Sequence, residues 1–312
     1  MYDLDGVLYL AGQPVPHAAV SVAAAATAGL RPAYVTNNAS RRPPLVAAAL
    51  RALGIAADDE DVVTSGQAAA RWLAERLPAG SAVLVLGTES LAEEVADSGL
   101  TPVRSADDAP AAVVQGLAPE TGWTELAEAA VALRSGALWV AGNADSTYPS
   151  PRGPLPGNGA MVAALRTATG RTPVVVGKPE PELHRLTVER VGARRPLVVG
   201  DRLDTDVLGA VRAGADSLLV LTGVVDRAEL LKAPAGCRPT YVADDLRGLL
   251  RPQPPVDGDT AHARCGGARA VWDGAALRVR GGDEEGLRAL CALAWRRSDA
   301  GLSVSGDVVD EQ

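Results

Sequence analysis

The sequence is poor in several residue types. Phe is absent, and of the 30 Lys and Arg residues only Lys178 and Lys232 are lysines. This skew is typical of codon bias. It makes the two lysines informative, because a lysine in such a chain can mark a place where a guanidinium would not serve. The three cysteines (Cys237, Cys265 and Cys291) lie far apart without a CxxC pair, and only three histidines occur. Neither a zinc site nor a disulfide framework is predicted, and a cytoplasmic location fits best.

Long apolar runs and an excess of positive charge are also missing. The longest apolar stretches are rich in Ala and broken by polar residues, so we expect no membrane span. The first residues lack a basic segment followed by an apolar run, so we expect no signal peptide. The formal net charge is -8 at pH 7, which argues against nucleic acid as a partner because like charges repel. The 312 residues, 47% of them hydrophobic, suffice for about two domains.

Short apolar runs alternate with helical patterns along the first 250 residues. This alternation predicts an α/β fold with parallel sheets and right-handed crossovers. Strands are expected at 33–36, 82–86, 111–114, 138–141, 173–176, 197–199 and 217–221. Helices are expected at 44–53, 66–76, 124–134, 159–168, 181–191 and 205–213.

The pattern of apolar runs and helical segments changes after about Arg251. A Pro-rich linker at 252–260 is followed by two expected strands, at 269–272 and 276–279, and by a helix at 284–297. This small ββα region is expected to pack against the rest of the chain or against a second subunit in a homodimer, without taking part in chemistry.

Polar residues that follow strands are informative, because ligands of parallel sheets bind at the carboxyl ends of strands. Asp3 and Asp5 are two residues apart, so both can face one pocket before Gly6 permits a turn. The alternative is an acidic turn at a frayed terminus. Thr36 and Asn37 end another expected strand, where the plain interpretation is a strand end before a helix cap.

Two further strand ends carry charge. Lys178 follows the run 174–177 and is either a solvated cation or part of a site. Asp201, Asp204 and Asp206 follow the strand at 197–199. Helix capping explains only part of this acidic cluster, whereas a divalent cation would relieve the mutual repulsion of its carboxylates.

Together the four strand ends supply a nucleophile, a hydroxyl, a fixed cation and oxygen ligands for a hard metal. Phosphoryl transfer through an aspartyl-phosphate needs this set. A phospho-receiver module shares some of these residues. It lacks an insertion as long as the segment between Thr36 and Lys178, and it carries its phosphorylated Asp on a middle strand. A dinucleotide-binding oxidoreductase lacks support, because no G-x-G-x-x-G follows a strand.

At these residues the sequence resembles the haloacid dehalogenase-like phosphatases. The likeness runs from residue 1 to about 251. It is greatest to the subgroup of NagD-type nucleotide, phosphoglycolate, pyridoxal phosphate and glycerol-3-phosphate phosphatases. The matching segments are Asp3-Leu4-Asp5-Gly6-Val7-Leu8, Thr36-Asn37-Asn38, Pro156-Gly157-Asn158-Gly159, Gly177-Lys178-Pro179 and Gly200-Asp201 with Asp206.

The resemblance implies a Rossmann-like, doubly wound core formed by residues 1–79 and 172–251. An α/β cap is expected at 80–171, and 252–312 remain as the accessory region. Only Met1 and Tyr2 precede Asp3, where the family has an apolar strand, so the first strand is expected to be very short.

The resemblance also implies a mechanism. Asp3 is the expected nucleophile, Asp5 the general acid and base, and Lys178 the stabilising charge. Thr36 and Asn37 would bind phosphate. Mg²⁺ would be held by Asp3, Asp201 and the backbone carbonyl of Asp5, with Asp206 supporting the set.

The cap is expected to choose the substrate. Asn143, Asp145 and Asn158 can face a leaving group or can be turn residues. The few aromatic residues of the cap disfavour stacking on a base or a pyridine ring. The predicted substrate is a small phosphate monoester, glycerol 3-phosphate. Phosphoglycolate, nucleotides and pyridoxal phosphate remain alternatives.

Overall fold

A computed structural model describes residues 1–148, 150, 152–304 and 308–311. Its contacts divide the chain into two compact units. The first unit contains residues 31–194 with 1 and 11–13, and the second contains 2–10, 14–30 and 195–312. These units do not follow the domain boundaries expected from the sequence, which stay a prediction.

The first unit is built around a five-stranded sheet. The order is β11 (Val174–Val175), β8 (Leu138–Ala141), β7 (Ala112–Gln115), β5 (Ala82–Leu86) and β6 (Thr101–Val103), and every pair is parallel. Alternate residues of β5 enter different apolar clusters, Val83 and Val85 on one face and Leu84 and Leu86 on the other. Both faces are therefore buried, which explains the continuous apolar runs of these strands.

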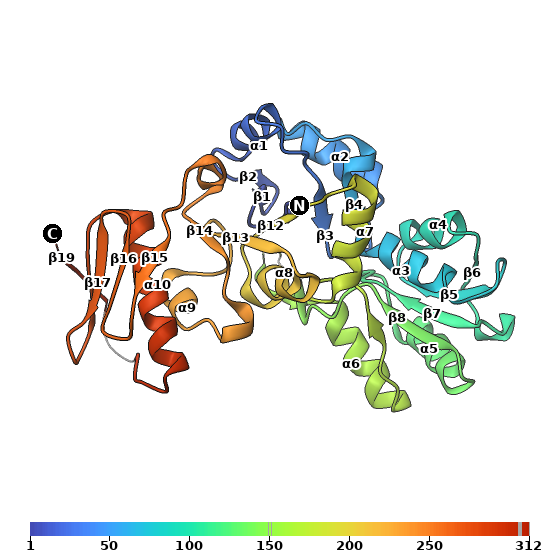
Figure 1. Cartoon of the computed structure of the whole chain (residues 1–312). Helices are drawn as coiled ribbons and strands as arrows, with labels where there is room; N and C mark the ends of the chain where they lie inside the picture. The colour runs from blue at the N-terminus through green and yellow to red at the C-terminus, as the bar shows by residue number, and fades with distance from the viewer. Residues whose placement is uncertain (149, 151, 305–307, 312) are drawn as a thin grey trace. The chain divides into compact units, whose positions relative to one another are not determined.

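Helices cover both faces of this sheet (Figure 1). One face packs against α3 (Ser65–Ala74) and α4 (Glu89–Asp97), and the other packs against α5 (Trp123–Arg134) and α6 (Asn158–Thr169). The sequence sets several helix ends. Thr64 caps α3 by accepting a hydrogen bond from Gln67 N at 3.2 Å, and Gly170 ends α6 in the left-handed conformation.

The parallel pair β3 (Tyr34–Thr36) and β4 (Val62–Thr64) completes the first unit with α2 (Pro43–Ala52) and α7 (Pro181–Val191). Val35 of β3, Val63 of β4 and Leu183 of α7 share one apolar cluster with the five-stranded sheet. This common core explains why the segment expected to form a cap does not separate from residues 31–79 in the contacts. A short antiparallel pair, β9 (Thr147–Tyr148) and β10 (Leu155–Pro156), precedes α6.

The second unit contains a parallel sheet of β12 (Leu197–Gly200), β13 (Asp216–Val220) and β14 (Tyr241–Ala243). The strand expected before Asp3 is reduced to one parallel bridge between Tyr2 and Val199. Before the C-terminal region, the described residues of this unit also form the helices α1 (Ala18–Thr27), α8 (Leu208–Ala213) and α9 (Arg227–Leu231) and the two-residue strand β1 (Tyr9–Leu10), which pairs with β2 (Gln13–Pro14).

The C-terminal region is larger than the expected ββα unit. The two expected strands are β17 (Ala268–Trp272) and β18 (Leu277–Arg280), and the expected helix is α10 (Asp283–Asp299). Three strands were not predicted: β15 (Val256–Gly258), β16 (His262–Cys265) and β19 (Val308–Glu311). Ala263 and Leu290 share an apolar cluster with Leu219 of β13, so this region packs against the parallel sheet of its own unit.

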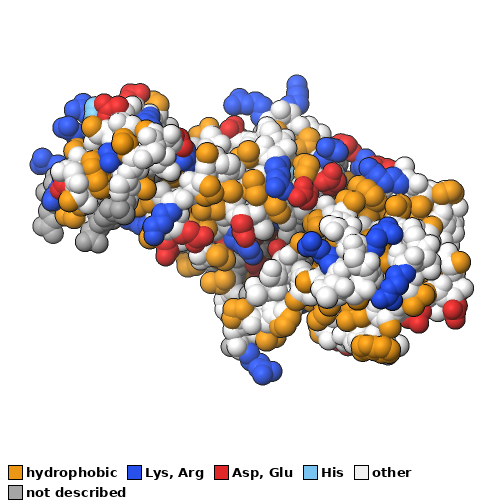
Figure 2. Space-filling model, turned by 90° about the horizontal axis from the view of Figure 1, so that it is seen from below, with side chains coloured by type: hydrophobic (Ala, Val, Ile, Leu, Met, Phe, Trp, Pro, Cys, Tyr) orange, Lys and Arg blue, Asp and Glu red, His pale blue; other side chains and the backbone are white. Residues whose placement is uncertain are grey.

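The described strand pairs from β3 to β8 and from β11 to β14 are all parallel, which confirms the α/β fold class. Among the described residues, no helix has both the length and the apolar character needed to cross a membrane. On the face seen in Figure 2, basic side chains lie singly or in small groups among acidic and apolar ones.

Candidate active site

Three carboxylates of the second unit gather at the carboxyl end of β12. Asp3 N donates a hydrogen bond to Val199 O at 2.8 Å, which places Asp3 beside that strand, and Asp201 follows the strand directly. One carboxylate oxygen from each of Asp3, Asp201 and Asp206 lies within 4.8 Å of the others. The structure therefore brings together three of the acids that the sequence assigned to a metal site.

Two glycines leave room for the carboxylate of Asp201. A Cβ on Gly6 would lie 2.3 Å from Asp201 Oδ2, and a Cβ on Gly223 would lie 1.9 Å from the same oxygen. Gly6 also has φ +82°, a conformation that other residues rarely adopt. Val224 N donates to Asp201 Oδ2 at 2.8 Å, and Thr222 Oγ1 donates to Gly6 O at 2.6 Å. The backbone at Gly6 and Gly223 therefore lies close to the Asp201 carboxylate, and a side chain at either glycine would collide with it.

Asp206 reaches the group through an irregular turn. The helix expected at 205–213 begins instead as a π-helical turn over Leu203–Val207, in which Val207 N donates to Arg202 O at 3.1 Å. The turn directs Asp206 back to the strand end, where its Oδ2 accepts from Arg202 N at 3.2 Å. A Cβ on Gly200 would lie 2.2 Å from the Cβ of Asp206, so this approach requires glycine. Such π-helical turns are frequent at functional sites.

The three carboxylates fit a hard divalent cation. Asp201 and Asp206 are each only 1% exposed, and Asp3 is half-buried. Buried carboxylates at this spacing repel one another in the absence of a counter-charge, and Mg²⁺ prefers oxygen ligands. Asp204 is different: it is exposed and its two oxygens pair with Arg202 at 3.0 and 2.9 Å. Partial desolvation by the surrounding protein acts to raise the pKa of Asp204, but hydrogen bonds and charge from Arg202 lower it overall.

Asp5 lies two residues beyond Asp3 and is exposed to solvent. The hydroxyl of Tyr9 donates to Asp5 Oδ2 at 3.5 Å, and Gly6 N donates to Tyr9 O at 2.7 Å. The side chain of Asp5 is not part of the acidic group formed by Asp3, Asp201 and Asp206. The expected role of Asp5 as general acid and base stays a prediction.

In the first unit, Asn37 connects two of the predicted motifs. Thr36 ends β3 and is 6% exposed, and Lys178 is 4% exposed. Asn37 Oδ1 accepts a hydrogen bond from Lys178 N at 2.7 Å, and Asn37 Nδ2 donates to Lys178 O at 3.0 Å. The side-chain amide of Asn37 thus pairs with the backbone of Lys178 on both sides. The expected contact between Asn37 and phosphate stays a prediction.

Asn143 and Asn158, expected at the substrate, use their amides on backbone groups. Asn143 Nδ2 donates to Asn37 O at 2.7 Å, and Asn158 Nδ2 donates to Asn143 O at 2.7 Å. Both side chains are buried. Asp145 Oδ2 accepts from Asn37 Nδ2 at 3.2 Å. The three residues lie in one hydrogen-bond network with Asn37, and a contact with substrate stays a prediction.

The sequence did not predict the close approach of Gly116 and Gly142 to the loop after β3. Gly116 follows β7 and Gly142 follows β8, and a Cβ on them would lie 2.9 and 3.1 Å from the Cβ of Ala39. Ser65 Oγ donates to Asn37 O at 2.5 Å. Residues 37–39 therefore rest against the carboxyl ends of these strands. The recurrence of glycine after the apolar runs at 82–86, 112–115, 138–141 and 174–176 was the available signal.

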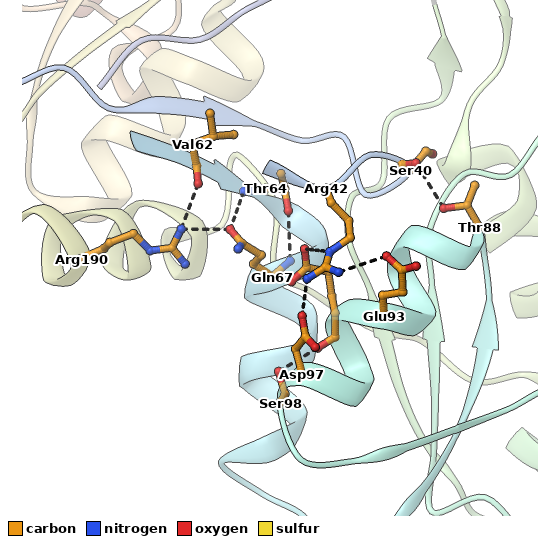
Figure 3. A network of polar contacts seen from close by, with 11 residues as sticks. Ser40, Arg42, Val62, Thr64, Gln67, Thr88, Glu93, Asp97, Ser98 and Arg190 are labelled. Atoms are coloured by element: carbon orange, nitrogen blue, oxygen red, sulfur yellow. Dashed lines mark hydrogen bonds and ion pairs between the residues drawn. The ribbon is translucent and has the colours of Figure 1, made fainter. Parts of the chain in front are cut away.

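Arg42 holds the same loop to α4 (Figure 3). Its guanidinium pairs with Glu93 at 3.1 Å, with Glu94 at 3.4 Å and with Asp97. Burial raises the pKa of Glu94, and the positive charge of Arg42 opposes this shift. Three acids on one helix thus meet one arginine, which fixes the chain just beyond Thr36 and Asn37.

Buried carboxylates at a strand end, in an α/β chain that also carries a buried lysine after a strand, are typical of metal-dependent phosphoryl-transfer enzymes. The family model described as haloacid dehalogenase-like hydrolase matches residues 1–101, and a second model of HAD-like hydrolases matches residues 175–249. The chain belongs to the haloacid dehalogenase-like hydrolases. The predicted family and hydrolase class are confirmed, and the receiver and oxidoreductase alternatives are rejected.

Individual relatives agree with this assignment. A D-glycerol 3-phosphate phosphatase from Mycobacterium tuberculosis is 47% identical over 96% of this chain and 94% of its own length. An acid sugar phosphatase from Staphylococcus saprophyticus is 34% identical over 80% of this chain and 96% of its own length. The crystal structure of a glycerol phosphate phosphatase from M. tuberculosis in complex with magnesium is similar with a TM-score of 0.84 and 46% identity, covering 100% of this chain and 92% of that one.

Proposed function

We propose that this chain is a Mg²⁺-dependent phosphatase that hydrolyses glycerol 3-phosphate through an aspartyl-phosphate. The observation that carries the proposal is the acidic group in which Asp3, Asp201 and Asp206 offer oxygens within 4.8 Å of one another. The relative at 47% identity supports the substrate, because it is named a D-glycerol 3-phosphate phosphatase.

The carboxylates divide into two functions. Asp3 is the nucleophile, which forms a bond to phosphorus as the bond to the glycerol oxygen breaks. Asp5 donates a proton to the leaving glycerol oxygen and then takes a proton from the water that hydrolyses the aspartyl-phosphate. Its exposure and its hydroxyl neighbour Tyr9 suit this proton exchange.

Asp3, Asp201 and the backbone carbonyl of Asp5 would hold Mg²⁺, with Asp206 supporting them. When bound, the cation neutralises charge on the phosphoryl oxygens and on the carboxylates around it. The relative solved with magnesium supports this choice of metal. The close fit of Gly6, Gly200 and Gly223 around Asp201 and Asp206 keeps these oxygens in place.

Lys178 and Thr36 supply positive charge and a hydroxyl donor to the transferring phosphoryl group. The assignment rests on their match to the family's third and second motifs and on the burial of both side chains. The side-chain amide of Asn37 already pairs with Lys178 and Asp145. We therefore assign the backbone N–H of Asn37 as its hydrogen-bond donor to phosphate.

The choice of glycerol 3-phosphate rests on the named relative, and of the aromatic residues at 80–171 only Trp139 supports a ligand without a ring, because Trp123 and Tyr148 are exposed. Trp139 is 4% exposed and its indole N–H donates to Gln115 at 3.1 Å, so its ring is not available for stacking. Phosphoglycolate, which also lacks a ring, remains the second candidate.

We infer a cytoplasmic enzyme from the free thiols of Cys237, Cys265 and Cys291, two of which are buried. Assembly into a homodimer is a further proposal, and light scattering of the purified chain would test it.

The substrate proposal is tested by phosphate release from a panel of monoesters. Glycerol 3-phosphate, phosphoglycolate, a nucleoside monophosphate and pyridoxal phosphate are compared at equal concentration, with Mg²⁺ or with a chelator. We expect the highest kcat/KM for glycerol 3-phosphate and loss of activity with the chelator. A higher kcat/KM for any other substrate contradicts the choice of substrate, and activity that survives chelation contradicts the metal-dependent mechanism.

A further inference from the structure

We propose that Asp145 is a positioning residue that acts through Asn37 to fix Lys178 for phosphoryl transfer. This inference rests on the proposed function and assigns to Asp145 a task distinct from contact with the leaving group.

The amide of Asn37 can pair with the backbone of Lys178 in one orientation only. Its oxygen must face Lys178 N, at 2.7 Å, and its nitrogen must face Lys178 O, at 3.0 Å. A rotation of the amide by half a turn would set donor against donor and acceptor against acceptor, which costs both hydrogen bonds.

Asp145 enforces this orientation. Its Oδ2 lies 3.2 Å from Asn37 Nδ2 and accepts the second hydrogen of that nitrogen. A carboxylate has acceptors only, so it would repel the amide oxygen of Asn37 if the amide were rotated. Hydrogen bonds to charged groups are also stronger than neutral ones.

The loop that carries Asp145 is itself built with little freedom. Asp145 N donates to Asn143 Oδ1 at 3.2 Å, and Asp145 O accepts from Gly159 N at 2.8 Å. A Cβ on Gly157 would lie 2.3 Å from Asp145 O, and a Cβ on Gly159 would lie 2.3 Å from Ala144 O. The segment Pro156-Gly157-Asn158-Gly159, which has no charged group of its own, therefore holds the backbone of Asp145.

The charge of Asp145 argues against direct contact with the phosphoryl group. A carboxylate facing a phosphate dianion is repelled unless a donor lies between them. Here the carboxylate accepts a hydrogen bond from Asn37, and Asn37 O is in turn held by Asn143 Nδ2 at 2.7 Å and Ser65 Oγ at 2.5 Å. Through its hydrogen bond with Asn37, the Asp145 carboxylate thus supports both Lys178 and the loop after β3.

A positioning role and a substrate contact predict different kinetics. The phosphoryl group is common to all substrates, so loss of the position of Lys178 reduces kcat by the same factor for every leaving group. A contact between Asp145 and the glycerol hydroxyls instead changes KM for glycerol 3-phosphate alone. The experiment measures kcat and KM of Asp145→Ala for glycerol 3-phosphate and for p-nitrophenyl phosphate, whose leaving group has no hydroxyl groups.

We expect Asp145→Ala to lower kcat by about 10- to 100-fold on both substrates, as for other displacements of about 1 Å in active sites. Asp145→Asn keeps an acceptor for Asn37 Nδ2 and should recover most of the activity. In a double-mutant cycle, Asp145→Ala should add little to the loss caused by Asn37→Ala, because both act on Lys178. Asp108→Ala, which removes an exposed acid from the same unit, should match the native enzyme.

Three outcomes overturn the inference: native kcat in Asp145→Ala, a loss confined to KM for glycerol 3-phosphate, or no recovery in a folded Asp145→Asn. Circular dichroism of each variant separates loss of fold from loss of position, and Asp145→Asn carries the test if Asp145→Ala does not fold. A native enzyme that releases no phosphate from either substrate with Mg²⁺ refutes the proposed function, and this inference falls with it.

Discussion

Gly177 is the position where one added methyl group should do the most damage to the first unit. An ideal Cβ on Gly177 would lie 2.2 Å from Gly142 O and 2.7 Å from Asn37 Oδ1. To bring the first distance to an ordinary contact, the backbone after β8 or β11 must move by about 1 Å, and such overpacking costs about 1–3 kcal/mol. Lys178 directly follows Gly177, so the same movement separates Lys178 from the side chain of Asn37.

For Gly177→Ala we therefore expect a lower Tm and a kcat reduced by about 100-fold, because a displacement of about 1 Å at an active site costs that much. Two controls isolate the cause. Gly236→Ala meets open space at an ordinary φ and should leave stability within about 0.5 kcal/mol. Gly170→Ala also meets open space but has φ +70°, so it should lower stability by about 1 kcal/mol and leave kcat unchanged.

The assay combines thermal unfolding with kcat and KM for glycerol 3-phosphate. If Gly177→Ala keeps the native Tm and kcat, the ends of β8 and β11 do not meet as the structure has them. If its kcat falls no further than that of Gly170→Ala, the link between Gly177, Asn37 and Lys178 is refuted.

Further predictions use other parts of the chain. Lys178→Arg should lose most activity because a planar fork does not replace a compact charge in a buried site, whereas exposed Lys232→Arg should match the native enzyme; equal rates would contradict this. Mg²⁺ should raise the Tm of the native chain but not of Asp201→Asn, and an equal rise would remove Asp201 from the metal site. Backbone N–H groups of Ala276 and Ala275 and the charge of Arg278 lower the pKa of Asp273 to about 2. This depressed pKa gives stability at neutral pH that is lost as the pH falls from about 4 to about 2. The Tm difference between the native chain and Asp273→Ala should therefore shrink over that pH range, and a constant difference would contradict the assignment.

The acidic group was predictable because its signal is local. Asp3 and Asp201 stand at strand ends, and the carboxyl ends of parallel strands share one edge of a sheet. The path of Asp206 was not predictable, because its π-helical turn has the same apolar spacing as an ordinary helix start. The structure explains the glycine at position 200, because a Cβ there would lie 2.2 Å from the Cβ of Asp206.

The network around Asn37 could not be predicted from the sequence. Asn37 and Lys178 are separated by 141 positions, and an asparagine after a strand is equally consistent with phosphate binding and with backbone pairing. Composition does not distinguish phosphate binding from backbone pairing, because the difference depends on which backbone groups lie within about 3 Å of the asparagine amide. The small strands β15 and β16 escaped notice for another reason: they have only three and four residues, and only Val256, Ala263 and Cys265 among them are apolar.

The central claim is that Asp3 forms the covalent bond to phosphorus. The most direct measurement is the rate of phosphate release from glycerol 3-phosphate by Asp3→Asn at saturating Mg²⁺, beside the native chain. We expect the rate of Asp3→Asn to fall by orders of magnitude below the native rate, with native-like unfolding. A folded Asp3→Asn that turns over substrate at a rate near that of the native enzyme would contradict it.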